Sequence, residues 1–491
     1  MYRMKQYAKS PVVLTAILLF LCLSLSFNCQ ADDLRPAAIF NDNMVLQRNT
    51  EIKIWGQANP GATVTINFAQ KKLSSVSDVN GNWAVFLPPF PECSSPQKMV
   101  IESGNKRKVF DNILIGDVWL ASGQSNMLMR VNSLKKEDRE AVMSIYDNEF
   151  RYTQITPVVE GGKTKVATQT GWESQHSENT RLWSAFSIYF AKELRRATNV
   201  PIGIICCAQG SSNIEAWIDK EFATRHSLTK HCGKDYPETH IYSNYKNTSS
   251  LFDSMLSRII GYNIKGVIWY QGEANAKTGI AKSYSQLLTG LIHCWREKWN
   301  NPDLAFGIVQ LPNYDYKEAP GGKDQSWAIV RQAQKEVCEK TPMSVMAVTI
   351  GLGEDGNIHP KNKEEAGKRM ASEVLSGISG FGKYPTSPEL GAPLLSGNKI
   401  IIPAQGLKKA AKIDGFEICT EGDTWRSVKA KVLRDRIVIQ TDDSFSGITS
   451  VRYAWRNTAR PTVLSRHGIP ASPMLWTFQD SPGRVRHRKS S

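Results

Sequence analysis

Two polar segments of the sequence hold residue types that together could hydrolyse an ester. An apolar, strand-like run from Ile113 ends at Gly123-Gln124-Ser125, a turn that would hold the serine hydroxyl clear of the backbone. A serine held in this way is a candidate nucleophile. Much further along, the polar loop 353–360 contains His359 and two carboxylates. Since a serine hydroxyl is a poor nucleophile until an imidazole accepts its proton, the two segments predict a serine esterase.

Each of these two residues also has a structural alternative. Ser125 could be an ordinary turn serine or the cap of a helix. His359 could be a loop histidine that is hydrogen-bonded to backbone groups. The helices and strands around Ser125 and His359 help to decide between the catalytic and the structural interpretation.

Strands alternate with helices between about residues 113 and 382, which predicts an α/β fold with a doubly wound parallel sheet covered by helices on both faces. We expect strands at 114–121, 202–208, 264–270, 304–311 and 344–350, and helices at 184–198, 249–260, 283–299, 324–338 and 362–377. Such sheets bind ligands beyond the carboxyl ends of their strands. Ser125, Gly210, Gln271 and the segment 351–359 all follow strand ends, so we expect them to meet at one edge. The irregular stretches 127–181 and 209–248 would be loops over that edge.

The flanking segments show β signals. Short alternating runs cut by Asn-Gly and Pro-Gly breaks predict a small β-sandwich over residues 32–112. Similar runs return after the central segment 113–382 and predict a β-rich region over residues 383–480. The last residues, 481–491, form a basic tail that we expect to be disordered.

The first 31 residues have the pattern of a secretory signal peptide. Three basic residues precede the apolar stretch 12–27, and small and polar residues follow it, with cleavage expected after Ala31. A membrane anchor is the alternative, but the apolar stretch is shorter than the ~20 residues that a spanning helix needs. We therefore expect a periplasmic or secreted protein without a membrane span.

Seven of the nine cysteines lie after the expected cleavage site. An odd number leaves at least one thiol unpaired, and none of the seven has the close spacing of a zinc site. We expect most of them to be buried small apolar residues, with room for one disulfide. Neither a metal nor a cofactor is predicted.

The formal net charge is +15, but part of it lies in the signal and in the last eight residues. The remaining surplus is dispersed, with no basic helix and no interleaved aromatic residues. This pattern is typical of a solvated surface and argues against a nucleic-acid partner. It would modestly help an acidic sugar to approach.

Five short strings, in this order, resemble the sialate O-acetylesterase family, a branch of the SGNH-type hydrolases that removes acetyl groups from carbohydrates. The strings are Ile39–Gln47, Gly123–Met127, Trp269–Asn275, Ile358–Lys363, and Val451–Trp455 with Ala471–Pro473. Together they cover nearly the whole chain after the expected signal.

The resemblance implies a role for each candidate residue. Ser125 would be the nucleophile of a two-step acyl transfer, and His359 the general base and acid. The N–H groups of Ser125 and Gly210 fit the oxyanion donors of the hydrolase pattern. Gln271 or Asn275 could add a side-chain amide, and Glu273 stands where the family places an acid, which we interpret as a positioning residue. Ordinary turn and strand-end roles are the alternative for these four.

The acid that would orient the histidine departs from the family pattern. Related hydrolases commonly have an aspartate two or three residues before the histidine, where this chain has Asn357 and Gly356. Family members also often have an aspartate at the position of Gly351. The nearest carboxylates are Glu354 and Asp355, and Asp355 is slightly favoured because a shorter side chain can fold back toward the ring. A serine–histidine dyad steadied by a backbone carbonyl is the alternative.

The sequence as a whole predicts a secreted esterase that deacetylates sialic acid or a related acetylated glycan. Acetylxylan esterase activity is an alternative, because the same machinery can serve either sugar. A glycan-binding protein without activity is another, since an orienting acid is missing. The sugar, the hydroxyl that is deacetylated and the oligomeric state stay open.

Overall fold

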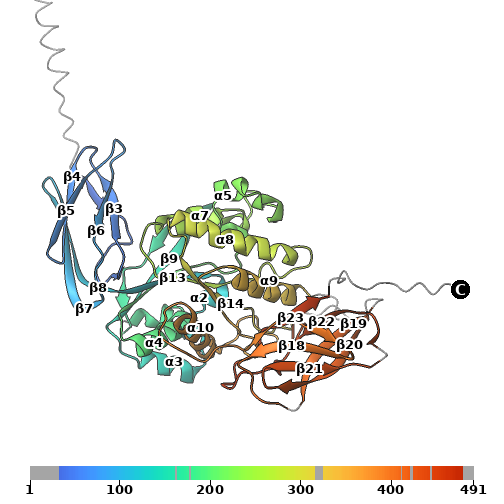
Figure 1. The fold of residues 1–491 in the computed structure, drawn as a ribbon. Helices are drawn as coiled ribbons and strands as arrows, with labels where there is room; N and C mark the ends of the chain where they lie inside the picture. Colours follow the sequence, from blue (N-terminus) through green and yellow to red (C-terminus); the bar gives the residue numbers. More distant parts are fainter. Residues whose placement is uncertain are drawn as a thin grey trace, which may run out of the picture.

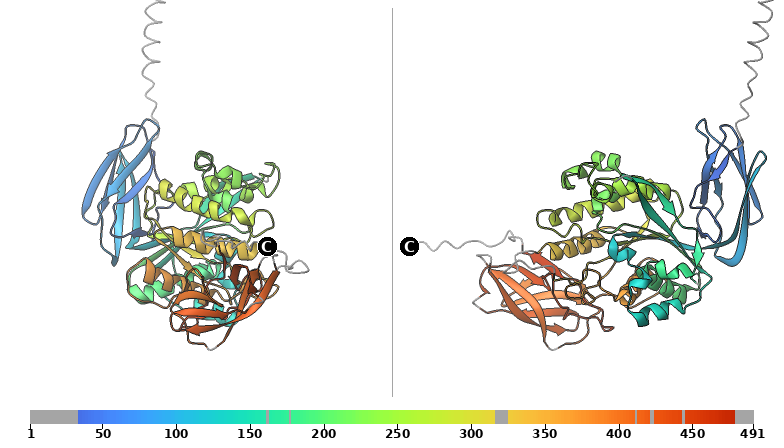
Figure 2. Two further views of the ribbon diagram at one scale, coloured as in Figure 1. Left: turned by 45° about the vertical axis from the view of Figure 1, so that its right-hand side comes forward. Right: turned by 180° about the vertical axis from the view of Figure 1, so that it is seen from behind.

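The computed structural model describes residues 33–160, 163–175, 178–315, 325–410, 412–420, 424–442 and 445–478. The expected signal peptide and the basic tail lie outside the described residues. Figure 1 shows three regions in a row along the chain: an N-terminal β region, a central α/β region and a C-terminal β region. The turned views of Figure 2 show the same arrangement, with the two β regions at opposite ends of the central one.

The N-terminal region consists of two small sheets around a shared apolar core. Alternation along the strands buries one face of each sheet, as in the run Val64, Ile66 and Phe68. One sheet has the order β1 (Leu34–Pro36), β3 (Ile52–Ala58), β6 (Asn82–Leu87), and the other pairs β4 (Thr63–Phe68) with β5 (Lys71–Val76) and β7 (Cys93–Ser103).

One long strand, β8 (Lys106–Gly123), joins this region to the central sheet. Its first part pairs with β7, and Leu114–Gly116 pairs with the short parallel strand β2 (Val45–Gln47). From Asp117 onward the same strand lies between β12 (Ile202–Ala208) and β13 (Gly266–Tyr270). The boundary expected between residues 112 and 113 therefore falls inside a continuous strand and not in a linker.

The central sheet has the order β10-β9-β12-β8-β13-β14-β15. All neighbours from β9 to β15 are parallel, which confirms the predicted parallel sheet. The remaining strands are β9 (Phe150–Glu160), β10 (Lys163–Gln169), β14 (Ala305–Val309) and β15 (Ser344–Ala347), and β11 (Glu173–Ser174) pairs with β9 at the edge.

Strands β9 and β10 contradict the expectation of a loop over residues 127–181. The start of β9 is buried, yet it contains polar residues and so lacks an apolar pattern. The polar groups find partners inside the protein: Thr153 Oγ1 donates to the carbonyl of Thr170 at 2.8 Å, and Gln154 N donates to Thr170 Oγ1 at 3.0 Å. A hydropathy pattern does not register a buried strand of this kind.

Helices cover both faces of the sheet (Figures 1 and 2). The core on one face contains Ala121, Cys206 and residues of α4 (Ala185–Thr198) and α10 (Lys363–Gly377). The core on the other contains Leu120, Cys207 and residues of α8 (Tyr284–Lys298) and α9 (Ser326–Lys340). These four helices confirm their predicted ranges to within two residues. The expected helix 249–260 is instead α7 (Ser250–Ser254) followed by the 3-10 turn η5 (Leu256–Arg258).

Short helical elements occupy connections between the larger elements, most of them within the stretches 127–181 and 209–248 that were expected to be irregular. They are α2 (Ser125–Leu128), η1 (Val131–Ser133), α3 (Lys136–Met143), η2 (Glu178–Leu182), η3 (Ile214–Trp217), α5 (Lys220–Arg225), η4 (Leu228–His231), α6 (Ser243–Lys246) and η6 (Ala281–Ser283). Within the described ranges, no helix combines the length and the apolar content that a membrane crossing requires.

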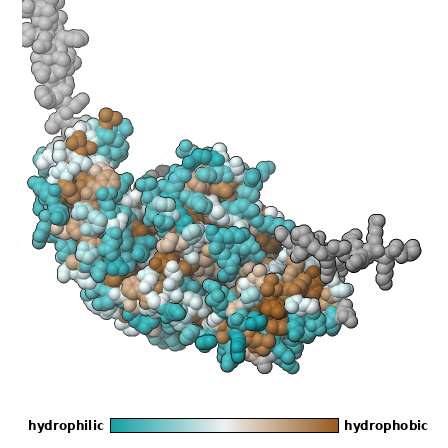
Figure 3. Space-filling model, viewed as in Figure 1, coloured by the Kyte–Doolittle hydropathy of each residue, from teal (hydrophilic) through white to brown (hydrophobic). Residues whose placement is uncertain are grey.

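The C-terminal region is an antiparallel sheet with the order β16-β18-β21-β20-β19-β22-β23, and β17 pairs with β18. Its strands are β16 (Glu389–Leu390), β17 (Leu394–Ser396), β18 (Lys399–Gln405), β19 (Ile413–Thr420), β20 (Thr424–Leu433), β21 (Arg436–Gln440), β22 (Ile448–Tyr453) and β23 (Met474–Thr477). Ser472 Oγ accepts a hydrogen bond from Gln310 Nε2 of the central region at 2.8 Å. Figure 3 shows apolar residues gathered on the visible face of this region. Its exposed large apolar side chains are Leu394, Leu395 and Leu433.

Candidate active site

Ser125 lies at the carboxyl edge of the central sheet because β8 ends there against β13. Gly123 has a φ of +132°, and a Cβ on it would lie 2.1 Å from the carbonyl oxygen of Tyr270. Only glycine fits this close approach. Gln124 N then donates to the same carbonyl at 3.0 Å, and the chain turns into α2, which begins at Ser125. The predicted turn after the first strand of the α/β region is confirmed.

His359 reaches Ser125 from the loop between β15 and α10. Its Nε2 lies 2.8 Å from Ser125 Oγ, although the two residues are 234 positions apart in the chain. Burial lowers the pKa of His359, and the charges of Lys363 and Lys361 lower it further. The imidazole is therefore neutral at pH 7, and an Nε2 without a proton can accept the serine proton.

Neither of the two candidate carboxylates touches the imidazole. Asp355 has a side chain that is 70% exposed, and its ion-pair partner is Arg460 at 3.7 Å. Glu354 accepts hydrogen bonds from Asn357 Nδ2 at 2.8 Å and from the backbone N–H of Lys361. The structure does not bring Asp355, the slightly favoured orienting acid, to the ring: its carboxylate is in solvent and is directed at Arg460.

Asn357 holds the backbone of His359 from both sides. Its Oδ1 accepts from His359 N at 3.0 Å, and its Nδ2 donates to the carbonyl of His359 at 2.9 Å. Glu354 steadies the same amide and thus acts on the histidine through Asn357. The residue at the position where related hydrolases have an aspartate therefore fixes the loop and not the ring.

Gly210, the candidate oxyanion donor, lies beside Ser125. A Cβ on Gly210 would be 3.7 Å from Ser125 Cβ, so the loop after β12 passes in contact with the serine. Gln209 N anchors this loop by donating to the carbonyl of Gly123 at 3.1 Å. This arrangement brings the backbone of Gly210 next to Ser125.

The side chains of Gln271 and Asn275 are fully buried and bond to other protein groups. Gln271 Nε2 donates to Ser212 O at 3.1 Å and to Asn275 Oδ1 at 2.8 Å. Asn275 Nδ2 donates to Glu215 Oε2 at 2.9 Å. The expected side-chain oxyanion donor is thus not found in either residue, because both amides tie the loop after β13 to the loop after β12.

Glu273 is 5% exposed, and its Oε1 accepts a hydrogen bond from Asn126 Nδ2 at 2.6 Å. Burial raises the pKa of Glu273, while the bond from Asn126 and the charge of Lys363 oppose that rise. The contact to the residue next to Ser125 agrees with the positioning role expected for Glu273.

Two further residues at this site did not come out of the sequence reasoning. Asn126 donates to the carbonyl of Ile358 at 2.9 Å and accepts from Lys363 Nζ at 2.6 Å. Lys363 is 1% exposed, and burial lowers its pKa to about 7. Both residues lie inside the sequence strings that carried the family resemblance, and this position was the sequence feature that could have identified them.

The seven cysteines in the described part of the chain are all free, so the single disulfide for which the sequence left room is not formed among them. Across the same ranges, no group of three or more His, Cys, Asp or Glu side chains is placed to hold a metal ion.

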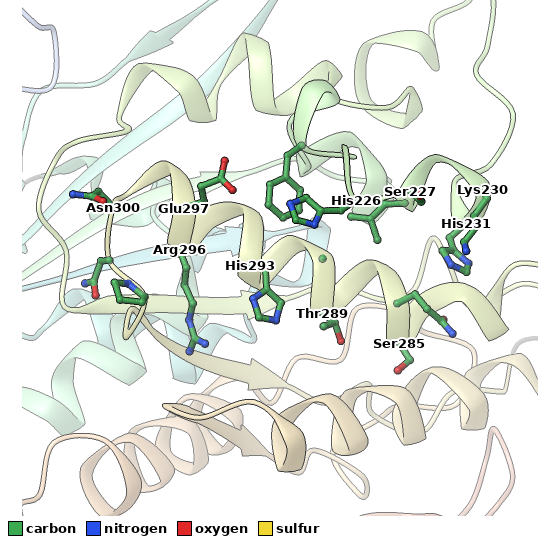
Figure 4. A pocket seen from close by; sticks show the side chains of 16 residues that line it. His226, Ser227, Lys230, His231, Ser285, Thr289, His293, Arg296, Glu297 and Asn300 are labelled. Carbon is green, nitrogen blue, oxygen red and sulfur yellow. The ribbon is translucent and has the colours of Figure 1, made fainter. Parts of the chain in front are cut away.

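A groove of about 970 Å³ lies elsewhere, between α8 and the segment of α5 and η4. Figure 4 shows side chains from both walls facing it, among them His226, His293 and Arg296. Ser125 and His359 do not line this groove, so we do not assign it to the reaction.

Residues 115–376, just over half of the chain, match the family model described as carbohydrate esterase, sialic acid-specific acetylesterase. The chain is 28% identical to the sialate O-acetylesterase of Homo sapiens, over 91% of this chain and 94% of that protein. It is also 28% identical to the sialate O-acetylesterase of Rattus norvegicus, over 92% and 95% of the two chains.

A solved structure shows the same similarity in three dimensions. A carbohydrate acetylesterase from Xanthomonas citri superimposes with a TM-score of 0.79 at 26% sequence identity, covering 91% of this chain and 99% of that one. The likeness therefore extends beyond the central region to the flanking β regions.

Proposed function

Since the chain belongs to the sialic acid-specific acetylesterase family of carbohydrate esterases, we propose that it removes O-acetyl groups from sialic acid or a related acetylated glycan by serine acyl transfer. The protein is a carboxylic ester hydrolase of this family. One observation carries the mechanism: Ser125 Oγ and His359 Nε2 lie 2.8 Å apart at the edge of a parallel sheet, where ligands bind. The central region is then an SGNH-type hydrolase domain.

In the first half of the reaction, His359 Nε2 takes the proton from Ser125 Oγ as the oxygen attacks the acetyl carbonyl carbon. The carbonyl oxygen becomes an oxyanion, for which the backbone N–H groups of Ser125 and Gly210 are the candidate donors. When the tetrahedral intermediate collapses, the imidazolium gives its proton to the departing sugar oxygen. The products of this half are the deacetylated sugar and an acetylated Ser125.

In the second half, His359 takes a proton from water, and the resulting hydroxide attacks the acetyl-serine carbonyl. A second oxyanion forms at the same place and collapses with the serine oxygen as the leaving group. His359 returns the proton to Ser125 Oγ, and acetate departs. One imidazole thus serves both halves as base and then acid.

The charges around the site favour a negatively charged substrate. Lys361 and Lys363 are the charges that lower the pKa of His359, and no carboxylate among the described residues bonds to the ring. A positive field favours an oxyanion and also attracts the carboxylate that a sialic acid carries. We propose on this ground that an acidic sugar is the preferred substrate, and on the signal pattern that the enzyme is periplasmic or secreted.

The test uses a chromogenic acetate ester with the wild type and Ser125→Ala. Loss of the nucleophile should lower kcat/KM by several orders of magnitude while the circular dichroism spectrum stays unchanged. A variant that keeps more than about a tenth of the wild-type rate would show that the nucleophile is another residue. Rates on O-acetylated sialic acid and on acetylxylan then decide the sugar, and a wild type without any hydrolysis would favour a glycan-binding protein.

A further inference from the structure

We propose that Asn126, Glu273 and Lys363 act as one positioning unit that holds His359 against Ser125 in place of a carboxylate on the imidazole. This inference rests on the proposed function. It concerns three residues that do not contact the acetyl group and that act through the backbone on either side of the catalytic pair.

The unit is a single carboxamide between two buried charges. Lys363 Nζ donates to Asn126 Oδ1 at 2.6 Å, and Asn126 Nδ2 donates to Glu273 Oε1 at 2.6 Å. Each charge favours the ionised form of the other group, and in these forms an ammonium group can only donate and a carboxylate can only accept. The two charges therefore admit one orientation of the Asn126 amide and exclude the flipped one.

The fixed orientation directs the donor of Asn126 at the histidine loop. Asn126 Nδ2 also donates to the carbonyl of Ile358 at 2.9 Å, and Ile358 directly precedes His359. Because Asn126 directly follows Ser125, one side chain links the nucleophile turn to the loop of the base. If the amide were flipped, Asn126 Oδ1 would face the carbonyl of Ile358, and the link would be replaced by repulsion.

The cost of burying these groups indicates that they serve more than packing. Asn126, Glu273 and Lys363 are 0%, 5% and 1% exposed, and Glu273 Oε2 has no hydrogen-bond partner in the described part of the chain. Well-packed apolar residues would stabilise such a place as well or better. The ammonium gains some compensation from the ring of Tyr270, whose centroid lies 5.3 Å from Lys363 Nζ.

The site needs such a device because His359 has no carboxylate partner among the described residues. In a Ser-His-Asp triad the aspartate fixes the tautomer and the orientation of the imidazole. Here the ring is placed through its backbone, by Asn357 at the residue itself and by Asn126 at the preceding carbonyl. Lys363 also acts on the ring through its charge, because it is the first of the two lysines that lower the pKa of His359.

The test compares Asn126→Ala and the neutral double variant Glu273→Gln/Lys363→Met with the wild type. The double variant keeps the shape of the site and leaves no unpaired buried charge, so it remains informative if Asn126→Ala does not fold. The matched control is Glu364→Gln/Lys368→Met, the same chemical change in an exposed ion pair of α10 whose Nζ and Oε1 lie 2.7 Å apart.

With a chromogenic acetate ester, we expect kcat to fall at least about tenfold in both test variants, with KM within about twofold of the wild type, and no change in the control. The acid limb of kcat/KM should move to higher pH in the double variant, because Lys363 lowers the pKa of His359 whereas Glu273, which is neutralised with it, is not among the groups that shift that pKa. The limb should stay in place in Asn126→Ala. Near-normal kcat and an unshifted acid limb in the double variant would overturn the proposal.

Crystal structures of the variants separate this inference from the proposed function. We expect the distance between Ser125 Oγ and His359 Nε2 to exceed a hydrogen bond in Asn126→Ala or in the double variant. A wild type that does not hydrolyse the ester would defeat the proposed function, and the distances would still decide the positioning role. Wild-type distances in both variants would overturn it.

Discussion

The loop that carries His359 should depend on Glu354 and not on its neighbour Asp355. Glu354 accepts from Asn357 Nδ2 at 2.8 Å on one side of the histidine and from the N–H of Lys361 on the other. Glu354→Gln keeps the shape of the side chain but replaces one accepting oxygen with an NH₂ group. That group faces a donor, so one hydrogen bond is lost and two donors meet.

The size of the effect follows from the bond that is lost. A hydrogen bond to a charged group contributes roughly 1.5–3 kcal/mol. Each 1.36 kcal/mol in the activation free energy is about tenfold in rate. If this free energy is lost from the transition state because His359 is less well placed, kcat/KM should fall by about tenfold to about a hundredfold.

The assay is the initial rate of hydrolysis of a chromogenic acetate ester, with Asp355→Asn as the matched control. Asp355 is exposed, and its pair with Arg460 spans 3.7 Å. Exposed ion pairs contribute about 0–1 kcal/mol, and this one does not touch the histidine loop hydrogen bonds, so the control should stay within about twofold of the wild type. A larger loss in Asp355→Asn than in Glu354→Gln would refute this reasoning, as would equal, near-normal rates in both.

Three further predictions address the base, the chemistry and the thiols. Because burial and two lysines depress the pKa of His359, the imidazole stays neutral until the pH falls through that lowered value, so the acid limb of kcat/KM should lie below pH 6.5; a limb at or above it would contradict the assigned field. Activity should survive prolonged treatment with EDTA, since serine acyl transfer needs no Lewis acid; reversible loss restored by zinc or manganese would overturn the mechanism. Thiol titration of the denatured protein without residues 1–31 should give seven free cysteines, and five would reveal a disulfide.

Much of the fold could be predicted because apolar period and element length agree in the central region. The predicted strand 202–208 is β12 to the residue, and Cys206 and Cys207 point to opposite faces as alternation requires. Strand β9 could not be predicted in this way, since its buried Thr153 and Gln154 are satisfied by hydrogen bonds that depend on the finished sheet. The sequence also did not predict that β8 continues from the N-terminal region into the central sheet. The reason is that a strand has the same local pattern whichever sheet it joins.

The candidate pair of Ser125 and His359 could be predicted because a serine at a strand-end turn and a histidine in a polar loop have complementary chemistry. The residues that position His359 could not be predicted in this way. Spacing along the chain shows which carboxylate is near in sequence, but it does not show which one is near in space. Asp355 is four residues from His359 and lies in solvent, whereas Glu273 is 86 positions away and reaches the histidine loop through Asn126. Buried polar networks of this kind are assembled by tertiary structure.

The charges at the site affect two species that form together in the reaction: the imidazolium of His359 and the oxyanion of the acetyl group. An aspartate on the imidazole would favour the imidazolium that forms when Ser125 loses its proton, but its negative charge would oppose the nearby oxyanion. Here the charges that act on the ring are cations, Lys363 and Lys361, which disfavour the imidazolium and favour the oxyanion. The arrangement therefore supports the negative charge that develops on an acetyl ester, while the orientation of the base is left to hydrogen bonds with Asn126 and Asn357. Different residues thus orient the base and set the charge around it. Asn126→Ala should therefore lower kcat without moving the acid limb of kcat/KM, and a change of Lys363 should alter both kcat and the acid limb.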